Sequence, residues 1–170
     1  GIVTKNGSII NADRQLMLFA ADVLSRNPGG KIIFDVKCTR NLAPWISQHG
    51  GTPIMWKTGH SFIKSKLIET QALLAGEMSG HLFFKERWYG FDDGLYAGAR
   101  LLELLSHQAD INAALNDLPD SLNTPELQIR VAEGENHALI AQLQKNAVFS
   151  SAQQVITIDG LRVEYSDGFG

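Results

Sequence analysis

Hydrophobic and polar positions follow two different periods along the first two thirds of the chain. Short apolar and β-branched runs, typical of buried strands, read KIIFDV at 31–36, TPIMWKT at 52–58 and ALLAGEM at 72–78. Between them lie segments with apolar residues three or four positions apart, which is the helical spacing. The pattern from residue 31 onward therefore predicts the order β, α, β, α, β.

Three helices are expected around these strands. The first has Asn11 or Asp13 available as its cap and ends at a Pro-Gly breaker. Its apolar positions are Leu16, Phe19, Ala20, Val23 and Leu24. The second reads NLAPWISQHG at 41–50 and tolerates its proline in the first turn, and the third reads SFIKSKLIET at 61–70.

The two ends of the chain carry further elements. Asn6-Gly7 predicts a tight hairpin, and a chain that starts on a strand without methionine is expected to be a piece of a longer protein. A strand is expected in HLFFKERW at 81–88, and a short helix at 110–118. The intervening helix, at 92–108, is expected to place Leu95, Ala99, Leu102 and Leu105 on one face.

A change of composition follows these elements. PDSLNTP at 119–125 has the marks of a linker. Beyond it, the stretch ELQIRVAE, a helix at about 136–149 and a hairpin turning at Asp159-Gly160 indicate the beginning of a second, α+β unit. No internal repeat is present.

The fold class follows from the alternation of strands and helices. Nearly continuous apolar strands separated by amphipathic helices predict a three-layer α/β/α fold with a mainly parallel sheet, followed by an incomplete α+β domain. Right-handed crossovers bring the carboxyl ends of such strands to one edge, where open α/β sheets bind ligands. Lys37, His60 and the segment 77–81 all fall at those ends.

Composition narrows the function classes. Hydrophobic residues make up 44% and charged residues 19% of the chain, as in a soluble globular protein, and the formal charge of −3 predicts no attraction to nucleic acid or membrane. The single cysteine, Cys38, excludes an intrachain disulfide, and a reducing compartment such as the cytoplasm is expected. We interpret Cys38 as a small buried hydrophobic residue, although Lys37 beside it could lower a thiol pKa.

The stretch LLAGEMSGHLFF at 73–84 contains the densest set of reactive side chains. Glu77, Ser79 and His81 alternate, so an extended backbone would place all three on one side as a polar row. No zinc-ligand spacing, nucleophile elbow, Walker loop or G-x-G-x-x-G fingerprint is present. These absences weaken zinc-site, hydrolase, nucleotidase and dinucleotide-binding interpretations.

The remaining cluster suits a polyhydroxylated anion. Glu77 can accept from hydroxyls, Ser79 can donate and accept, and Lys37 supplies positive charge. His60 and His81 can bind phosphate or move a proton. Taken alone, each of these residues also has an ordinary structural explanation: Glu77 could be a satisfied loop carboxylate, and Ser79-Gly80 could merely make a turn. No function is assigned to the other histidines, which are His49, His107 and His137.

Three motifs carry a family resemblance. GEMSGH at 76–81, FDVKCTR at 34–40 and WKTGHSFIK at 56–64 resemble the third domain of the α-D-phosphohexomutase family, in particular its bacterial phosphomannomutase/phosphoglucomutase members. The resemblance extends over essentially the whole chain. It implies a terminal hairpin of domain 2 at 1–8, the sugar-specificity domain 3 at 9–120 and an incomplete domain 4 at 121–170.

The resemblance also implies an activity and residue roles. Members of the family are isomerases that interconvert hexose 1-phosphates and 6-phosphates of glucose and mannose through a phosphoserine and a hexose 1,6-bisphosphate. Glu77 and Ser79 match the loop that grips the sugar O3 and O4 hydroxyls. Lys37 and His60 match positions that contact the sugar phosphate. His81 matches a histidine near the phosphoserine and is a candidate for proton transfer.

The chain departs from the family pattern in what it lacks. No phosphoserine loop and no aspartate-rich Mg²⁺ loop is present, and Asp92-Asp93 is interpreted as the start of a helix. Magnesium and the glucose 1,6-bisphosphate activator are therefore expected to belong to a longer enzyme, and this portion alone is expected to be inactive. A non-catalytic sugar-phosphate-binding module and a purely structural α/β domain are the alternatives.

Overall fold

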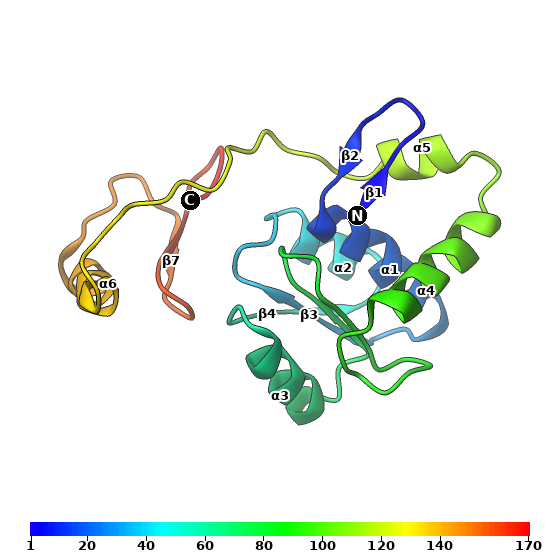
Figure 1. Cartoon of the computed structure of the whole chain (residues 1–170), viewed down its shortest axis with the longest axis horizontal. Helices are drawn as coiled ribbons and strands as arrows, with labels where there is room; N and C mark the ends of the chain where they lie inside the picture. Colours follow the sequence, from blue (N-terminus) through cyan, green and yellow to red (C-terminus); the bar gives the residue numbers. More distant parts are fainter. The chain divides into compact units, whose positions relative to one another are not determined.

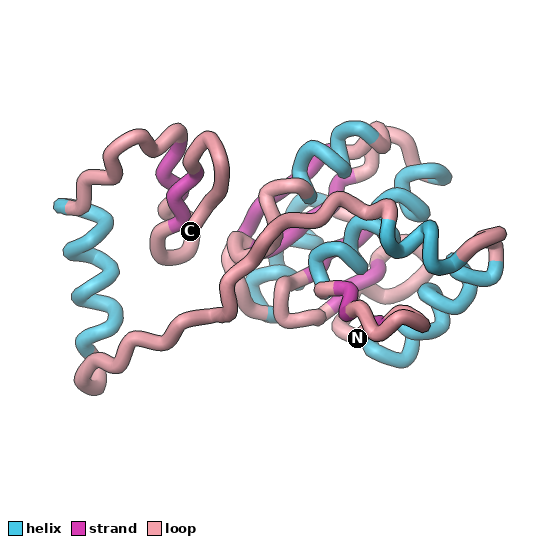
Figure 2. Tube along the Cα trace, turned by 90° about the horizontal axis from the view of Figure 1, so that it is seen from above, coloured by secondary structure: helices cyan, strands magenta, loops and turns pink.

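A computed structural model describes residues 1–170 and divides them into two compact units, Gly1–Ser121 and Leu122–Gly170. The first unit consists of a central sheet with helices on both faces (Figure 1). The second consists of one helix and a hairpin after an extended segment (Figure 2). The linker-like segment 119–125 includes the point at which the two units divide.

The central sheet of the first unit is mainly parallel, as the sequence pattern predicts. Its strand order is β4 (Thr52–Trp56), β3 (Lys31–Asp35), β5 (Leu74–Gly76) and β6 (Leu82–Phe84). Strand β3 pairs in parallel with both β4 and β5, whereas β6 returns antiparallel to β5. The chain therefore reverses direction between β5 and β6, within the stretch that contains the candidate residues.

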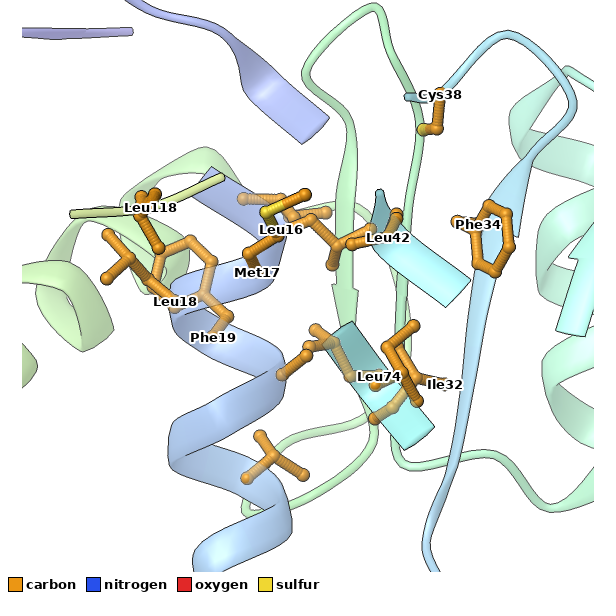
Figure 3. Packing of buried hydrophobic residues seen from close by; sticks show 14 of the residues in the cluster. Leu16, Met17, Leu18, Phe19, Ile32, Phe34, Cys38, Leu42, Leu74 and Leu118 are labelled. Carbon is orange, nitrogen blue, oxygen red and sulfur yellow. The ribbon is translucent and has the colours of Figure 1, made fainter. Parts of the chain in front are cut away.

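Both faces of the sheet are buried, which explains why the strands are almost continuously apolar. Ile32 and Phe34 of β3 join the larger core with α1 (Ala12–Arg26) and α2 (Leu42–Gln48), as seen in Figure 3. Ile33 points to the opposite face, where it packs with buried residues of the third helix. Successive side chains of β3 point to opposite faces of the sheet, so this one strand contributes residues to both hydrophobic cores.

Helix α3 (His60–Thr70) covers that opposite face and begins at His60. Helix α1 matches the predicted helix, and Asn11 occupies its N-cap position but makes no side-chain capping bond. The other capping candidate, Asp13, accepts hydrogen bonds from the backbone N–H groups of Arg14 and Thr39. The helix positions were thus correctly predicted, while neither side chain acts as the expected cap.

The predicted N-terminal hairpin is present. Strands β1 (Ile2–Val3) and β2 (Ile9–Ile10) pair antiparallel, and Gly7 has a φ of 84° in the turn between them, a conformation that favours glycine. Ile2 and Ile10 are buried in the larger core. The hairpin therefore packs as part of the first unit.

Helix α4 (Gly94–Ser106) exists where predicted, but of the four residues on its expected buried face only Leu105 packs, partly buried, against the larger core. Leu95 is 91% exposed and Leu102 is 71% exposed, whereas Ala97 and Arg100 are buried. Helix α4 instead points Arg100 toward the interior, because two acidic side chains and an aromatic ring are available there to contact the guanidinium. The shorter α5 (Ile111–Asn116) follows as predicted, capped by Asp110.

Arg100 is buried and is the centre of an ion network that attaches α4 to the rest of the unit. Its guanidinium lies 2.9 Å from the carboxylate of Asp22 on α1 and 2.8 Å from that of Glu86, and 4.8 Å from the centre of the Phe84 ring. Arg26 also contacts both acids. The hydrogen bond from Arg26, together with that from Arg100, lowers the pKa of Asp22 below its ordinary value.

The second unit has α+β composition, as predicted. It contains α6 (Glu135–Asn146) and the antiparallel pair β7 (Gln154–Ile156) and β8 (Arg162–Glu164), with Gly160 at a φ of 69° in their turn. The stretch ELQIRVAE forms neither helix nor strand, and α6 has no buried residue. No helix in the described chain has the length and apolar character needed to cross a membrane.

Replacing Arg100 by methionine is expected to lower the free energy of unfolding by about 3 kcal/mol, because two partly buried acids lose their buried partner. Chemical denaturation followed by circular dichroism measures this loss. Arg87→Met is the matched control, since Arg87 pairs with Glu103 at an exposed site and its loss should change stability by less than about 1 kcal/mol. Equal effects of the two substitutions would contradict the role of the network.

The lowered pKa of Asp22 predicts a pH-dependent contribution. A carboxyl group whose pKa is lower in the folded state stabilises the fold above its ordinary pKa of 3.8 and loses that contribution as the pH falls through its lower folded value. Asp22→Asn should therefore be less stable than the parent chain near neutral pH, by about 1 kcal/mol. The difference should shrink as urea titrations are repeated at pH values below 4, and a constant difference would contradict it.

Candidate functional site

Three loops meet at the carboxyl-end edge of the parallel strands. They follow β3, β4 and β5 at residues 36–41, 57–59 and 77–81. The register places the last residue of β3, Asp35, opposite Trp56 at the end of β4. This edge is where α/β sheets of this kind bind ligands, and it is where the sequence pattern predicts the reactive residues.

Asp35 ties the three loops to one carboxylate. Its side chain is fully buried and accepts from Thr58 Oγ1 at 3.2 Å and from the backbone N–H of Met78 at 3.1 Å. The thiol of Cys38 donates to it at 3.0 Å. Burial, with Asp35 nearby, raises the pKa of the Cys38 thiol, so Cys38 is a protonated structural donor.

Asp35 is not among the site residues predicted from the sequence. A charged residue at the end of an otherwise apolar strand was the available signal, because such a group is rarely buried unless it has several partners. The neighbouring loops that supply these partners are distant in sequence, at Thr58 and Met78. Sequence alone therefore did not show that one carboxylate joins them.

Glu77 is buried and half satisfied. The residue is 3% exposed, and its Oε2 accepts from the backbone N–H of Gly59 at 2.8 Å. Its other oxygen, Oε1, is buried and has no hydrogen-bond partner. Gly59 has a φ of 119°, a conformation that favours glycine, and it directly precedes His60 at the start of α3. The site therefore contains a fixed carboxylate with one unused acceptor.

The predicted polar row of Glu77, Ser79 and His81 is wrong. The backbone N–H of Gly80 donates to the carbonyl of Glu77, and that of Glu77 donates to the carbonyl of His81, so the segment is a tight turn and not an extended strand. Gly80 has a φ of 99° in this turn. Because β6 must return beside β5, Glu77 becomes buried while Ser79 and His81 are exposed.

His81 lies between a second histidine and an aspartate. Its Nδ1 is 2.6 Å from Asp92 Oδ2, and its ring centre is 6.5 Å from that of His60. The predicted helix start at Asp92-Asp93 is confirmed for Asp93, which caps α4, whereas the helix itself begins at Gly94 and Asp92 lies before it. The carboxylate of Asp92, just before the helix, contacts the imidazole of His81.

Most of the predicted residues thus gather at one edge. Glu77 is hydrogen-bonded to the residue before His60, and His60 lies beside His81. Lys37 and Ser79 are exposed on the loops that Asp35 joins, those after β3 and β5. The described chain contains no group of three His, Cys, Asp or Glu side chains that could hold a metal ion. The arrangement can accept hydrogen bonds from hydroxyls and present cationic or imidazole groups to an anion.

Comparisons with known proteins agree on one family. Residues 11–122 match the family model described as phosphoglucomutase/phosphomannomutase, alpha/beta/alpha domain III. The chain is 66% identical to a phosphoglucomutase of Neisseria meningitidis serogroup A and 57% identical to a phosphomannomutase/phosphoglucomutase of Pseudomonas aeruginosa. In both cases the match covers 100% of this chain and 37% of the relative.

A solved structure of a phosphoglucomutase/phosphomannomutase family protein from Burkholderia thailandensis superimposes with a TM-score of 0.93 at 65% identity. The match covers 99% of this chain and 36% of that protein. The chain therefore spans little more than a third of the length of the relatives it matches. Family model, relatives and solved structure together show that the chain belongs to the phosphoglucomutase/phosphomannomutase family.

Proposed function

We propose that this chain is the sugar-binding portion of a phosphomannomutase/phosphoglucomutase. The complete enzyme would interconvert hexose 1-phosphates and hexose 6-phosphates of glucose and mannose through a phosphoserine and a hexose 1,6-bisphosphate. In this proposal residues 1–8 close the preceding domain, 9–120 form the sugar-specificity domain and 121–170 begin the last domain. The buried, unpartnered Oε1 of Glu77 is the observation that carries the proposal.

An unpartnered buried carboxylate oxygen is unfavourable, because the group has lost its water without gaining a donor. Its position is nevertheless fixed, since the other oxygen accepts from Gly59. A sugar hydroxyl that donates to Oε1 would recover the lost interaction. Ser79, exposed two residues later, can donate to or accept from a neighbouring hydroxyl. The two residues would then recognise O3 and O4, which glucose and mannose share.

The phosphate of the substrate needs positive charge and hydrogen-bond donors. Lys37 supplies a full charge, and His60 supplies an imidazole in the first turn of α3, where the helix dipole also favours an anion. Asp35 holds the loops that carry these residues at a fixed separation. Fixed placement is what phosphoryl transfer requires most, since it depends on positioning and charge stabilisation.

His81 is the proposed proton-transfer residue. It is exposed at the same edge and lies beside His60. A neutral imidazole there can take the proton of the sugar hydroxyl that attacks the phosphoserine. The phosphoserine and the magnesium ligands are proposed to lie in other parts of a longer enzyme, and this portion alone should not turn over substrate.

Replacing Glu77 by glutamine in the complete enzyme should raise the KM for glucose 1-phosphate and mannose 1-phosphate by about 10- to 100-fold. An amide cannot accept from both Gly59 and a sugar hydroxyl, because one of its two polar atoms is a donor. Glu69→Gln is the control, since Glu69 is an exposed residue on α3. Steady-state kinetics of both variants test the role.

Titration of the 170-residue chain with the same sugar phosphates, followed by NMR, separates a binding module from a structural domain. Selective shifts of the amides at 76–81, absent with the C4 epimer galactose 1-phosphate, would support recognition of O4. Unchanged affinity of Glu77→Gln for glucose 1-phosphate and mannose 1-phosphate would contradict the proposed contact.

Asp35→Asn should weaken sugar-phosphate binding although Asp35 touches no substrate in this proposal. The amide carries no charge, and its nitrogen cannot accept as the carboxylate oxygen does, so the hydrogen bonds that join the three loops should weaken at a cost of about 1–3 kcal/mol of stability. The loops should then become less ordered, which hydrogen exchange at 57–59 and 77–81 measures. Asp167→Asn, at an exposed position of the second unit, is the control. Unchanged exchange in the Asp35 variant would contradict the positioning role.

A further inference from the structure

The contact between His81 and Asp92 limits where the proton of the imidazole can be. The two atoms, His81 Nδ1 and Asp92 Oδ2, are 2.6 Å apart, which is a short hydrogen bond. An ionised carboxylate can only accept, so the proton of this bond must be on Nδ1. The neutral histidine then carries its lone pair on Nε2.

Asp92 is held in place from two sides. Its Oδ1 accepts from the backbone N–H of Leu82 at 3.3 Å, and Asp92 forms an isolated antiparallel bridge with Phe83 of β6. The next residue, Asp93, caps α4 by accepting from the N–H of Tyr96. The position of Asp92 is thus set both by the sheet and by the start of a helix that Arg100 fixes to α1.

We propose that Asp92 is a positioning residue that keeps His81 in the Nδ1–H tautomer and assigns proton transfer to Nε2. This inference rests on the proposed function. As the sugar hydroxyl attacks the phosphoserine, its O–H bond breaks and the proton moves to Nε2. A new O–P bond forms, and the electron pair of the broken P–O bond goes to the serine oxygen. The reverse transfer returns the proton to the sugar oxygen.

His60 provides an internal comparison. Its ring centre is 6.5 Å from that of His81, so both imidazoles share one edge of the sheet and similar exposure to solvent. The contact with Asp92 Oδ2 is made by His81. Asp92 therefore distinguishes two adjacent histidines chemically, and only His81 should respond when Asp92 is changed.

The primary test is a long-range ¹⁵N–¹H NMR correlation of the imidazoles in the 170-residue chain, recorded at a pH where the spectra show both histidines neutral. The expected result is a protonated Nδ1 for His81. Asp92→Asn should move the tautomer of His81 toward Nε2–H, while leaving the tautomer of His60 unchanged. The asparagine retains an oxygen that can accept from Leu82, so the fold should persist. A wild-type His81 with its proton on Nε2 would overturn the proposal.

Kinetics in the complete enzyme give the second readout. Asp92→Asn should lower kcat at least about tenfold and leave KM within about twofold, because the wrong tautomer presents no lone pair to the hydroxyl. In a His81→Gln background the same change should have no further effect. A loss of kcat that is equally large in that background would overturn the proposal by showing a purely structural role.

Different results would contradict the proposed mutase function and the proposed role of Asp92. An enzyme that interconverts hexose phosphates but shows no tautomer change in Asp92→Asn retains the proposed function and loses this inference. A complete enzyme without mutase activity loses the proposed function, and with it the assigned proton transfer. Because the tautomer of His81 is measured without substrate, it tests the effect of Asp92 on His81 whether or not the complete enzyme is a mutase.

Discussion

The site depends first on one buried carboxylate. Asp35 ends a strand at the centre of the sheet, and it accepts hydrogen bonds from three different loops. Burying a charge without partners is strongly unfavourable, so the loops that donate to it are the loops that can close over this edge. The separation of Lys37, His60 and Glu77 therefore follows from a residue that need not touch the ligand.

The second consequence of this arrangement is an acceptor left without a partner. Glu77 is buried because its turn is attached to Asp35 and because Gly59 donates to one of its oxygens. Its other oxygen stays unsatisfied within the chain. The free-energy cost of removing water from this oxygen arises when the chain folds. A ligand hydroxyl that donates to it therefore adds a hydrogen bond without a further desolvation cost for the carboxylate.

The packing of α4 against the core also fixes the surroundings of His81. Helix α4 turns Arg100 inward to the acids of α1 and of the loop after β6, which leaves its leucines Leu95 and Leu102 in solvent. Hydrophobic periodicity could not predict this, because it treats every arginine as a surface residue. The same packing places the start of α4, and hence Asp92, against His81.

The sequence by itself determined the order of helices and strands, the mainly parallel sheet and the edge at which the reactive residues collect, since these depend on local periodicity and on the handedness of crossovers. Tertiary structure alone decided that Glu77, Ser79 and His81 form a turn and not a row, and that Asp35 and Asp92 hold the site together. The hydrogen bonds from Thr58 and Met78 to Asp35 join residues far apart along the chain, and the turn at 77–81 depends on the return of β6 beside β5. Their geometry exists only once the strands are paired and the helices packed, because hydrogen bonds between distant segments leave no periodic trace in the sequence.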